Sequence, residues 1–412
     1  MATINKRKII NDPVYGFIKI PSDLLYDLIE HEYFQRLRRI KQLGLTHIVY
    51  PGAMHTRFQH ALGAMHLMSS AVDTLRSKGH DISDEESEAV HAAILLHDIG
   101  HGPFSHVLEN TLLEVSHEAI SLIMMQDLNS QMNGKLDMAL SIFNNTYQKK
   151  FLHQLVSSQL DMDRLDYLKR DSFFTGVSEG VIGSDRIIKM LNVMDDDLVI
   201  ESKGIYSIEK FLVARRLMYW QVYLHKTALV AERMLIHILK RAKQLVAEGL
   251  ELFAPPHLIY FMKEQLTIDK FQELPSIVEN FALLDDDDIM SSIKVWTNHE
   301  DPILSKLAQN FVHRQLFSIE LSPSPFDGKK VNSIKETIKE RYKLENTEDI
   351  NFFLYSDTIS NNAYNPSDER IKILYGNNTL VDITDASDML NLSVLGKTVR
   401  KHYLCYPKMT DQ

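Results

Sequence analysis

An adjacent histidine and aspartate, His97 and Asp98, follow an apolar run at residues 92–96. Such a pair is costly to bury unless a positive charge compensates it. Imidazole and carboxylate are both ligands of first-row divalent metals, so a metal ion is the natural compensator. Glycines and a proline then break the helix and keep His101 and His106 near the same place. The alternative is that histidines at a helix C-terminus only offset the helix dipole. The coincidence of several such features favours a metal site.

Histidine is concentrated in one part of the chain, because residues 47–117 contain ten of the 18 histidines. An even distribution would place only about three there. A second polar stretch carries Asp163, Tyr167 and Asp171 at intervals of four, so these side chains share one face of a helix. A charged helix of this kind is usually a solvated face. Near a metal site, however, it offers the further carboxylate that such a site usually needs.

The elements that must position these residues are predicted to be mainly helical. A hairpin over residues 9–20 comes first. Capping residues then predict four helices: one from Ser22 to Gly44, one over 55–79, one opened by a capping box of Ser83 and Glu86 that ends at the His-Asp pair, and one capped by Ser116. The polar face of the first helix is expected to be solvated; it consists of Gln35, Arg36, Arg38 and Arg39.

A β-ribbon over residues 191–206 is predicted to precede a long helix over 207–249. If that helix is continuous, it is roughly 60 Å long at 1.5 Å per residue. Arg215, Tyr219 and Tyr223 recur on it at intervals of four, so one face can point at a shared pocket. An equally good interpretation is a packed helix with aromatic core positions.

Pro255-Pro256 marks a break in the predicted helices, and the sequence pattern itself changes at Leu316. The acidic run at 285–288 is interpreted as N-terminal charge on a helix rather than a cation site. Beyond it, the pattern predicts a small α+β unit with a structural or oligomeric role, made of strands at 316–321, 352–355, 371–375 and 399–406 and a helix at 331–344.

Length and composition are those of an ordinary globular protein, with 412 residues and 44% hydrophobic residues. The net charge of −10 argues against a general nucleic-acid coat and against binding to anionic membranes. Cys405 is the only cysteine, so no intrachain disulfide forms. The N-terminus has no apolar signal-peptide core, and no apolar run approaches membrane-spanning length. We expect a cytoplasmic protein.

The order of the candidate ligands, His60, then His97-Asp98, then Asp163, matches the H…HD…D signature of the HD-domain phosphohydrolase superfamily. The flanking motifs resemble one subgroup, which contains the mammalian SAM-and-HD-domain dNTP triphosphohydrolase and bacterial dGTPase-like proteins. These motifs are QRLR at 35–38, KQLG at 41–44, PGAxHxRFxH at 51–60, HDIGHGPFSH at 97–106, DxDxxDY at 161–167 and YxHK at 223–226. The resemblance runs from about residue 9 to about residue 226 and then weakens; no SAM domain is expected.

The resemblance implies a mainly α fold, with a helical HD-domain core and a small C-terminal α+β subdomain. The expected segments are an N-terminal hairpin and first helix (1–50), the HD core (51–250), a helical extension (251–315) and the α+β subdomain (316–412). It also implies one divalent metal ion per chain, whose identity among Mn, Fe, Mg, Ni, Co and Zn is open. The implied ligands are His60, His97, Asp98 and Asp163.

The resemblance further implies a dNTP triphosphohydrolase, with dGTP as a favoured substrate. The implied contacts with the triphosphate are Arg57, Arg164, Tyr167 and Arg215, and Tyr219 joins the same pocket. The implied sugar contacts are Gln42, Leu43, Asp171 and Tyr223, the last of which would exclude a 2′-hydroxyl. His101 and His106 would lie against the α-phosphate, and His117, oriented by Glu109, would protonate the leaving oxygen. The family has lysine where Arg164 stands, and the mammalian relative has aspartate where Glu109 stands.

A guanine-nucleotide activator and a homo-oligomer, either a dimer or a tetramer, are implied as partners. The matching regulatory positions are Lys8, Ile9, Asn11, Glu30, Gln35 and Arg38, although the family has aspartate where Glu30 stands. The alternative is that Gln35 and Arg38 are ordinary surface residues. Two other functions stay open: hydrolysis of a nucleoside monophosphate, cyclic nucleotide or alarmone, and a non-catalytic nucleotide sensor on the same scaffold.

Overall fold

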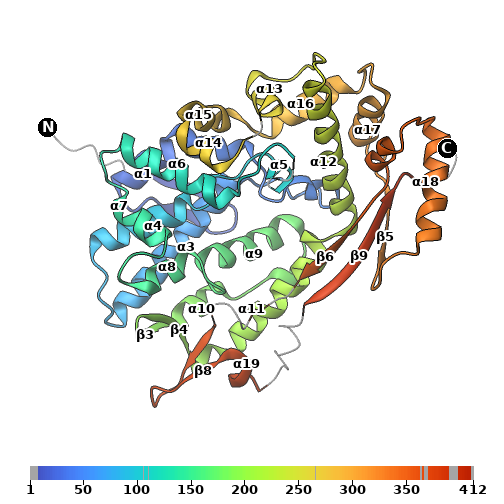
Figure 1. Cartoon of the computed structure of the whole chain (residues 1–412). Helices are drawn as coiled ribbons and strands as arrows, with labels where there is room; N and C mark the ends of the chain where they lie inside the picture. Colours follow the sequence, from blue (N-terminus) through green and yellow to red (C-terminus); the bar gives the residue numbers. More distant parts are fainter. Residues whose placement is uncertain are drawn as a thin grey trace.

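The computed structural model describes residues 8–104, 106–109, 111–264, 266–361, 364–365, 370–388 and 398–409. The protein is mainly helical, as predicted, with three small sheets among the described residues (Figure 1). The helices at the centre of the fold are α3 (Arg57–Ser77), α4 (Asp84–Leu96), α5 (His106–Glu109), α6 (His117–Gln131) and α9 (Met162–Thr175). Around them lie α7 (Asp137–Phe143), α8 (Lys150–Val156) and α10 (Ser184–Met190).

The central packing is that of α3 against α4 and α9. Gly63 of α3 allows the close approach to α9, because a Cβ atom there would lie 2.0 Å from Asp166 Oδ1 and 2.2 Å from Arg170 Nη2. Ser83 and Glu86 form the predicted capping box of α4, and the Ser116 side chain caps α6. These predicted helix starts are confirmed, and they place His97 at the C-terminal end of α4.

The N-terminal helix differs from the prediction. The antiparallel strands β1 (Ile9–Asp12) and β2 (Gly16–Lys19) form the expected hairpin. The single helix predicted up to Gly44 is wrong, because the chain is extended at His31. Its pieces are α1 (Asp23–Glu30), α2 (Glu32–Gln35) and the 3₁₀ turns η1 (Arg36–Arg39) and η2 (Gly44–Ile48).

The break at His31 also changes the environment of the basic residues that follow. Arg38 and Arg39 are exposed, as expected, but Arg36 is only 1% exposed. The prediction of a solvated polar face is therefore wrong for Arg36. After the turn, η1 points this one side chain into the core, where it donates to three backbone carbonyls.

The long helix predicted over 207–249 is not continuous. Helix α11 (Ile205–Met218) runs into a π-helical turn at Tyr219–Tyr223, and α12 (Lys226–Ala247) begins after it. His225 has an extended backbone, and its side chain accepts a hydrogen bond from Thr227 N, so it caps the new helix. The π-turn also turns aromatic side chains toward α9, since the rings of Tyr167 and Tyr223 lie 6.0 Å apart.

The C-terminal part joins two different sheets. Strand β4 (Asp197–Glu201) forms the predicted ribbon with β3 (Leu191–Met194), and it also pairs in parallel with β7 (Lys372–Leu374), which pairs with β8 (Leu380–Asp382). The second sheet has the order β5-β9-β6. It consists of β5 (Ser318–Ser322), β6 (Tyr355–Asn361) and β9 (Val399–Tyr406), and Figure 1 shows it beside α12. The strand expected at 352–355 starts only at Tyr355, because residues Glu348–Phe352 form a 3₁₀ turn. The four predicted segment boundaries stay a prediction.

The remaining helices lie in different parts of the fold. Figure 1 shows α13 (Pro256–Lys263), α14 (Ile268–Glu273), α15 (Pro275–Leu283) and α16 (Asp286–Trp296) together at the top of the view, and α17 (Pro302–Val312) packs against α12 and α16. Helix α18 (Gly328–Tyr342) lies at the right of the view, and α19 (Ile383–Ala386) packs beside β7 and β8. The acidic run at 285–288 forms a capping box at the start of α16, as predicted.

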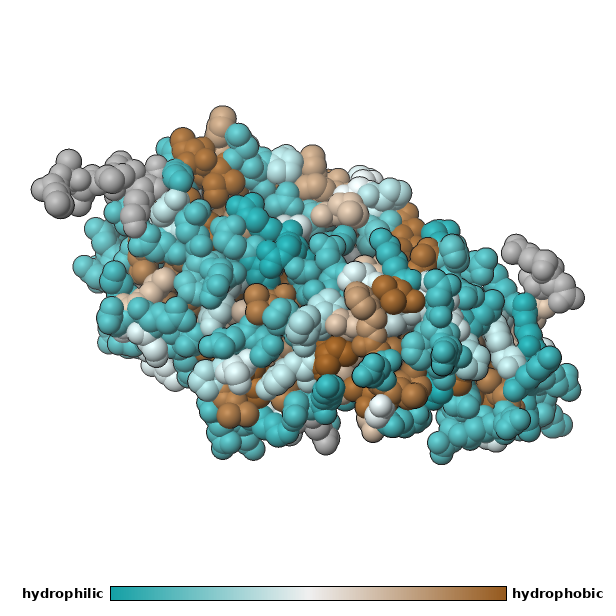
Figure 2. Space-filling view, turned by 90° about the horizontal axis from the view of Figure 1, so that it is seen from above, coloured by the Kyte–Doolittle hydropathy of each residue, from teal (hydrophilic) through white to brown (hydrophobic). Residues whose placement is uncertain are grey.

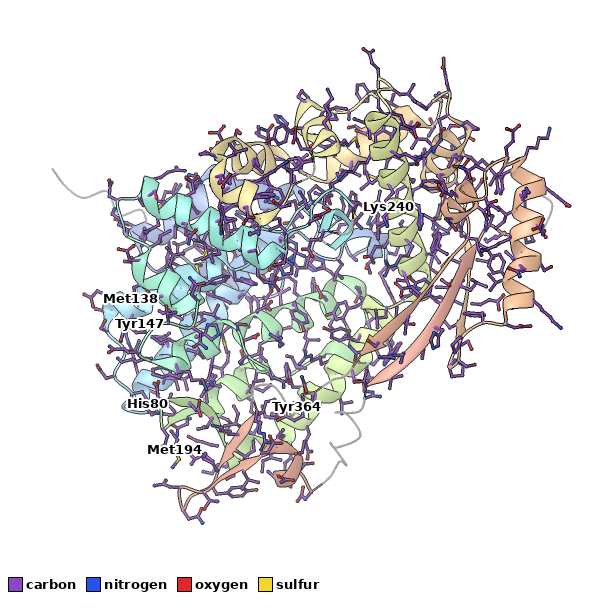
Figure 3. The ribbon with its side chains drawn as sticks, in the orientation of Figure 1. His80, Met138, Tyr147, Met194, Lys240 and Tyr364 are labelled. Atoms are coloured by element: carbon purple, nitrogen blue, oxygen red, sulfur yellow. The ribbon has the colours of Figure 1, made fainter. Side chains whose placement is uncertain are left out.

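Side-chain hydrogen bonds also connect segments of the chain that are far apart in the sequence. His80 and Tyr147, labelled in Figure 3, bond Asn192 at 2.6 Å and Glu86 at 2.7 Å. Hydrophilic residues cover most of the face seen in Figure 2, and hydrophobic residues form separate patches on it. Among the described residues, no helix combines the length and the apolar character needed to span a bilayer.

Candidate active site

Three side chains from α3, the end of α4 and α9 converge beneath a large cavity. One ligand atom from each of His60, His97 and Asp163 can be chosen so that all three lie within 4.8 Å of one another. Asp163 Oδ1 lies 3.0 Å from His60 Nε2 and 3.5 Å from His97 Nε2. The fold thus brings together three of the four predicted metal ligands, although they are separated by up to about 100 residues of chain.

The two histidines are held so that Nε2 faces this cluster. His60 Nδ1 bonds Asp166 Oδ2 at 2.8 Å, and His97 Nδ1 bonds the carbonyl oxygen of Ile94 at 2.6 Å. A proton on each Nδ1 leaves a lone pair on Nε2, which is the arrangement found in metal-ligating histidines. Both Nε2 atoms are buried and have no hydrogen-bond partner among the described residues. Two imidazoles and a carboxylate in this state fit a divalent metal ion.

The electrostatics of the cluster also favour a cation. Burial opposes a positive charge on His60, but the carboxylates of Asp163 and Asp166 outweigh it and raise the pKa of His60 to about 10. Without an ion, Nε2 of His60 therefore binds a proton at neutral pH, and a bound metal ion would displace that proton. Burial likewise opposes ionisation of Asp163, yet His60 and His97 keep its pKa below its usual value. The centre is therefore a buried region of negative potential.

Asp98, the fourth predicted ligand, lies beside this group. Its carboxylate oxygens are 3.4 Å from His97 Nε2 and 3.7 Å from His60 Nε2, and one of them accepts a hydrogen bond from Arg57 Nη1. Burial would raise the pKa of Asp98, but the facing imidazoles and Arg57 hold it well below its usual value. Asp98 is thus ionised and close, and its role as a ligand stays a prediction.

The cavity above the cluster has a volume of about 650 Å³. Most of the residues assigned to the site from the sequence line it, although they come from six separate segments. These lining residues are Gln42, Leu43, Arg57, Asp98, His101, His117, Asp163, Arg164, Tyr167, Asp171, Tyr219 and Tyr223. Glu109 and Arg215 do not belong to the lining. The side chain of His106 lies outside the described part of the structure.

Two histidines and a glutamate form a second group in the cavity wall. His117 Nδ1 bonds Glu109 Oε1 at 2.8 Å, and the same oxygen accepts from the backbone N–H of His117 at 3.2 Å. The rings of His101 and His117 face each other with their centroids 3.8 Å apart. Burial and the charge of Arg57 lower the pKa of His101 to about 3, so its ring is neutral at physiological pH. Both imidazoles have a carboxylate beside them, since His101 Nδ1 also lies 3.2 Å from Asp98 Oδ1. Because the ring of His101 is neutral, His117 is the candidate proton donor of the two.

A hydrogen-bonded group occupies another part of the wall. Tyr223 Oη donates to Asp171 Oδ2 at 2.8 Å, and His55 Nε2 bonds Asp171 Oδ1 at 2.7 Å. The backbone N–H of Gln42 donates to the carbonyl oxygen of His55, while Gln42 Oε1 is buried without a partner among the described residues. These groups suit a hydroxyl-bearing ligand, because they supply both an ionised acceptor and amide groups.

Two arginines near Tyr167 have buried N–H donors that make no hydrogen bond with a described residue. Arg164 Nη1 pairs with Asp161, but Arg164 Nε is buried without a partner among the described residues. Arg215 Nε and Nη1, on α11, are likewise buried without a hydrogen-bond partner among the described residues. Buried guanidinium donors without partners are costly, and an anion such as phosphate would satisfy them.

Several residues of the site were not found by sequence reasoning. Asp166 and His55 orient His60 and Asp171; they belong to recognised motifs but carried no signal of their own. The other missed residues line the cavity from η2, from α5 and the turn before it, from α12 and the residue before its cap, and from β6. They are Leu45, Thr46, Phe104, Val107, Leu224, Ala228, Leu229, Glu232, Arg233 and Ile359. The packing of these separate segments around the cavity reveals them.

The residues predicted to form a regulatory site lie near the surface, outside the cavity lining. Arg38 Nε donates to Gln35 Oε1 at 2.8 Å, and its guanidinium lies 3.6 Å from the ring centroid of Phe58. Lys8 Nζ donates to Tyr26 Oη at 2.6 Å. Ile9 and Asn11 lie on β1, and Glu30 ends α1. A nucleotide site at these residues stays a prediction.

Comparison with known proteins agrees with this geometry. The family model of the HD domain matches residues 57–171, and that of the HD associated region matches residues 182–274. The uncharacterized protein YwfO of Bacillus subtilis is 35% identical over 98% of this chain and 93% of its own length. The deoxynucleoside triphosphate triphosphohydrolase SAMHD1 homolog of Dictyostelium discoideum is 32% identical over 61% of this chain and 52% of its own length.

A solved structure extends the similarity to the whole fold. The crystal structure of a phosphohydrolase from Bacteroides thetaiotaomicron is 56% identical, and it covers 98% of this chain and 100% of that chain with a TM-score of 0.94. HD domains bind divalent metals, and the grouped His60, His97 and Asp163 fit such an ion. The chain therefore belongs to the HD-domain phosphohydrolase superfamily, within the subgroup similar to the SAM-and-HD-domain dNTP triphosphohydrolases.

Proposed function

We propose that the protein hydrolyses deoxynucleoside triphosphates at the α-phosphorus and releases a deoxynucleoside and intact tripolyphosphate, with dGTP as a favoured substrate. The observation that carries the proposal is one cavity whose lining includes Asp163 of the metal-binding cluster, Arg164, whose Nε has no partner among the described residues, and the Tyr223–Asp171 pair. A triphosphate needs several cationic donors beyond the metal, whereas a monophosphate needs fewer.

In this proposal His60, His97 and Asp163 hold the divalent ion, with Asp98 as a fourth ligand. When bound, the ion supplies Lewis-acid chemistry at the phosphate and lowers the pKa of a water molecule. Arg57, which bonds Asp98, and Arg164 and Arg215 then offset the charge of the triphosphate. These three arginines are part of the same proposal, with Tyr167 and Tyr219 beside them.

His117 is proposed as the general acid. Its Nδ1 is held by Glu109, so Nε2 is the atom that would deliver a proton to the leaving 5′-oxygen. His101, which stacks on His117, is neutral and would position the α-phosphate rather than donate the proton. His106 is proposed to act beside it.

The sugar is proposed to lie against Tyr223, with its 3′-hydroxyl bonded by Gln42 and Asp171 and with Leu43 packed nearby. A 2′-hydroxyl would then clash with Tyr223 or displace its hydrogen bond with Asp171. We therefore expect deoxynucleotides to be preferred over ribonucleotides.

The experiment is a product assay with the four dNTPs and four rNTPs in the presence of Mn, Mg, Fe, Co, Ni or Zn. We expect tripolyphosphate and a deoxynucleoside, and a lower kcat/KM for GTP than for dGTP. Release of orthophosphate, or turnover of a monophosphate, cyclic nucleotide or alarmone instead, would favour the second enzyme hypothesis. Nucleotide binding without turnover by the metal-loaded protein would favour a non-catalytic sensor.

The predicted activator site is a separate part of the proposal. If guanine nucleotide binds at Gln35 and Arg38, the protein should be a homo-oligomer, and GTP or dGTP should raise its activity toward another dNTP. Arg38→Ala should abolish that rise and leave metal binding unchanged. A monomer whose activity is indifferent to guanine nucleotide would refute this part and leave the catalytic proposal standing.

A further inference from the structure

The buried guanidinium of Arg36 lies behind the cavity wall and takes no part in the functions proposed above. It belongs to η1 and is 1% exposed. Among the described residues, its hydrogen-bond partners are three backbone carbonyls: Nε donates to Leu284 O at 3.0 Å, Nη1 to Ile99 O at 3.1 Å and Nη2 to His101 O at 2.6 Å. No described carboxylate lies within ion-pair distance of it. Burial lowers the pKa of Arg36 to about 9, so it is still charged at neutral pH.

Burying a charge whose hydrogen bonds go only to carbonyls costs desolvation free energy, and surface residues elsewhere could stabilise the fold at a lower cost. The location of the three carbonyls therefore indicates what Arg36 does in the fold. Two of the three, those of Ile99 and His101, flank Gly100 in the loop that directly follows the His97-Asp98 pair. Arg36 thus holds, through two hydrogen bonds, the backbone of the loop that carries His101, which is proposed to face the α-phosphate.

Gly100 is pressed against the helix that carries His117. A Cβ atom at Gly100 would lie 2.2 Å from the backbone N of Ser121 and 2.4 Å from the carbonyl oxygen of His117. In the same helix, Ser121 Oγ accepts a hydrogen bond from Gly100 N at 2.9 Å. The loop is therefore held between Arg36 on one side and the first turns of α6 on the other, and this sets the separation of the His101 and His117 rings.

The guanidinium itself is held in a fixed plane. Its Cζ atom lies 4.6 Å from the ring centroid of Phe281 in α15, and its third carbonyl partner, Leu284, ends the same segment. Three diverging hydrogen bonds from one planar group define an orientation that a lysine ammonium cannot reproduce. Arg36 therefore connects α15 rigidly to the loop at 99–101.

We propose that Arg36 is a positioning residue, whose guanidinium holds the loop at 99–101 against α6 and thereby sets the facing geometry of His101 and His117. It contacts neither substrate nor metal. A misplacement on the order of 1 Å in an active site costs about 10²-fold in rate. The effect should therefore appear in the chemical step rather than in substrate binding.

The test is Arg36→Lys, with Arg39→Lys as the matched control. Arg39 belongs to the same 3₁₀ turn, but its side chain is 48% exposed and pairs with Asp285. With Mn and dGTP, we expect Arg36→Lys to lower kcat by about 10–100-fold with KM nearly unchanged and metal stoichiometry intact. Arg39→Lys should retain the wild-type kcat. The kinetic part rests on the proposed dNTP hydrolysis.

A second measurement does not depend on the substrate. In histidine-labelled protein, the ring NMR signals of His101 and His117 should move in Arg36→Lys, while those of the distant His299 and His313 should not. If kcat falls only in proportion to the folded, metal-loaded fraction and these signals stay in place, Arg36 is merely structural and the proposal is wrong. Failure of the wild type to hydrolyse any dNTP would instead refute the proposed function and leave the NMR test intact.

If Arg36→Lys does not fold, Phe281→Leu tests the same inference more gently. It removes the ring that holds the guanidinium plane and leaves Arg36 in place. We expect the same pattern, with kcat lowered about threefold and the signals of His101 and His117 shifted. A folded Phe281→Leu protein in which neither kcat nor these signals change would overturn the proposal.

Discussion

Two regions of the site differ in how far the protein satisfies its own polar groups. In the metal region, His60 and His97 each have one ring nitrogen fixed by a partner from the protein, so the other is oriented before any ligand binds. In the arginine region, Arg164 and Arg215 keep buried donors without partners among the described residues. The first region is organised by the fold, and the second is completed by an anionic ligand.

The difference between the two regions predicts which step each substitution affects. Changes in the metal region should remove the ion or weaken its binding, and should thereby lower the rate of the chemical step. Changes in the arginine region should weaken substrate binding and leave the ion in place.

The largest effect is expected for Asp163→Ala. It removes the carboxylate that both imidazoles face, so the protein should lose its metal and its activity together. The loss of rate should exceed the about 10²–10³-fold that removal of a single transition-state donor costs. Metal analysis and turnover of dGTP measure both, with the exposed Asp185→Ala as control. Full metal occupancy in Asp163→Ala would contradict the assignment.

The second prediction concerns proton donation. His117→Ala should keep metal and substrate binding but lower kcat by about 10²–10⁴-fold. Glu109→Gln should have a smaller effect in the same direction, because it removes only the group that orients His117. Steady-state kinetics with His313→Ala as control check this. A rise in KM without a fall in kcat would make His117 a binding residue.

The third prediction tests the partner that orients a metal ligand. Asp166→Asn should weaken metal binding by about 10–100-fold, because Asp166 fixes the ring of His60 without reaching the ion itself. Calorimetric titration with Mn, and recovery of activity at high Mn concentration, would measure this. Unchanged metal affinity in a folded variant would show that the fold alone orients His60.

The smallest effect on the kinetics is expected for a substitution in the arginine region. Arg215→Gln removes charged donors but leaves the metal cluster untouched, so KM for dGTP should rise about tenfold with metal stoichiometry unchanged. The neighbouring Arg216→Gln is the control. Loss of metal in Arg215→Gln would show that the metal region and the arginine region do not act separately.

Much of the site was predictable, because the chemistry of a metal ligand belongs to its residue type. The ordered motif of His60, His97-Asp98 and Asp163 indicated the metal centre and the family before any contact was known. Helix starts were equally readable, since the capping residues Ser83 and Ser116 act within one turn of the chain.

Other features depend on contacts between distant segments, and local patterns cannot report those. Arg36 looked like a solvated arginine until the break at His31 turned it toward Ile99 and Leu284. The helix predicted through Leu224 and His225 is interrupted by the π-helical turn and the extended backbone of His225, and α12 then contributes residues to the cavity lining.

The sequence by itself thus determined the mainly helical class, the helix starts and the candidate metal ligands. Only the tertiary structure decided that Asp166 orients His60 across 106 residues, that the strands after Leu316 divide between two sheets, and that Ile359 of β6 reaches the cavity. The difference arises from the distance along the chain over which each interaction acts. Propensity, capping and ligand chemistry act within a few residues, whereas burial and hydrogen bonding between remote segments are settled only when the whole chain packs.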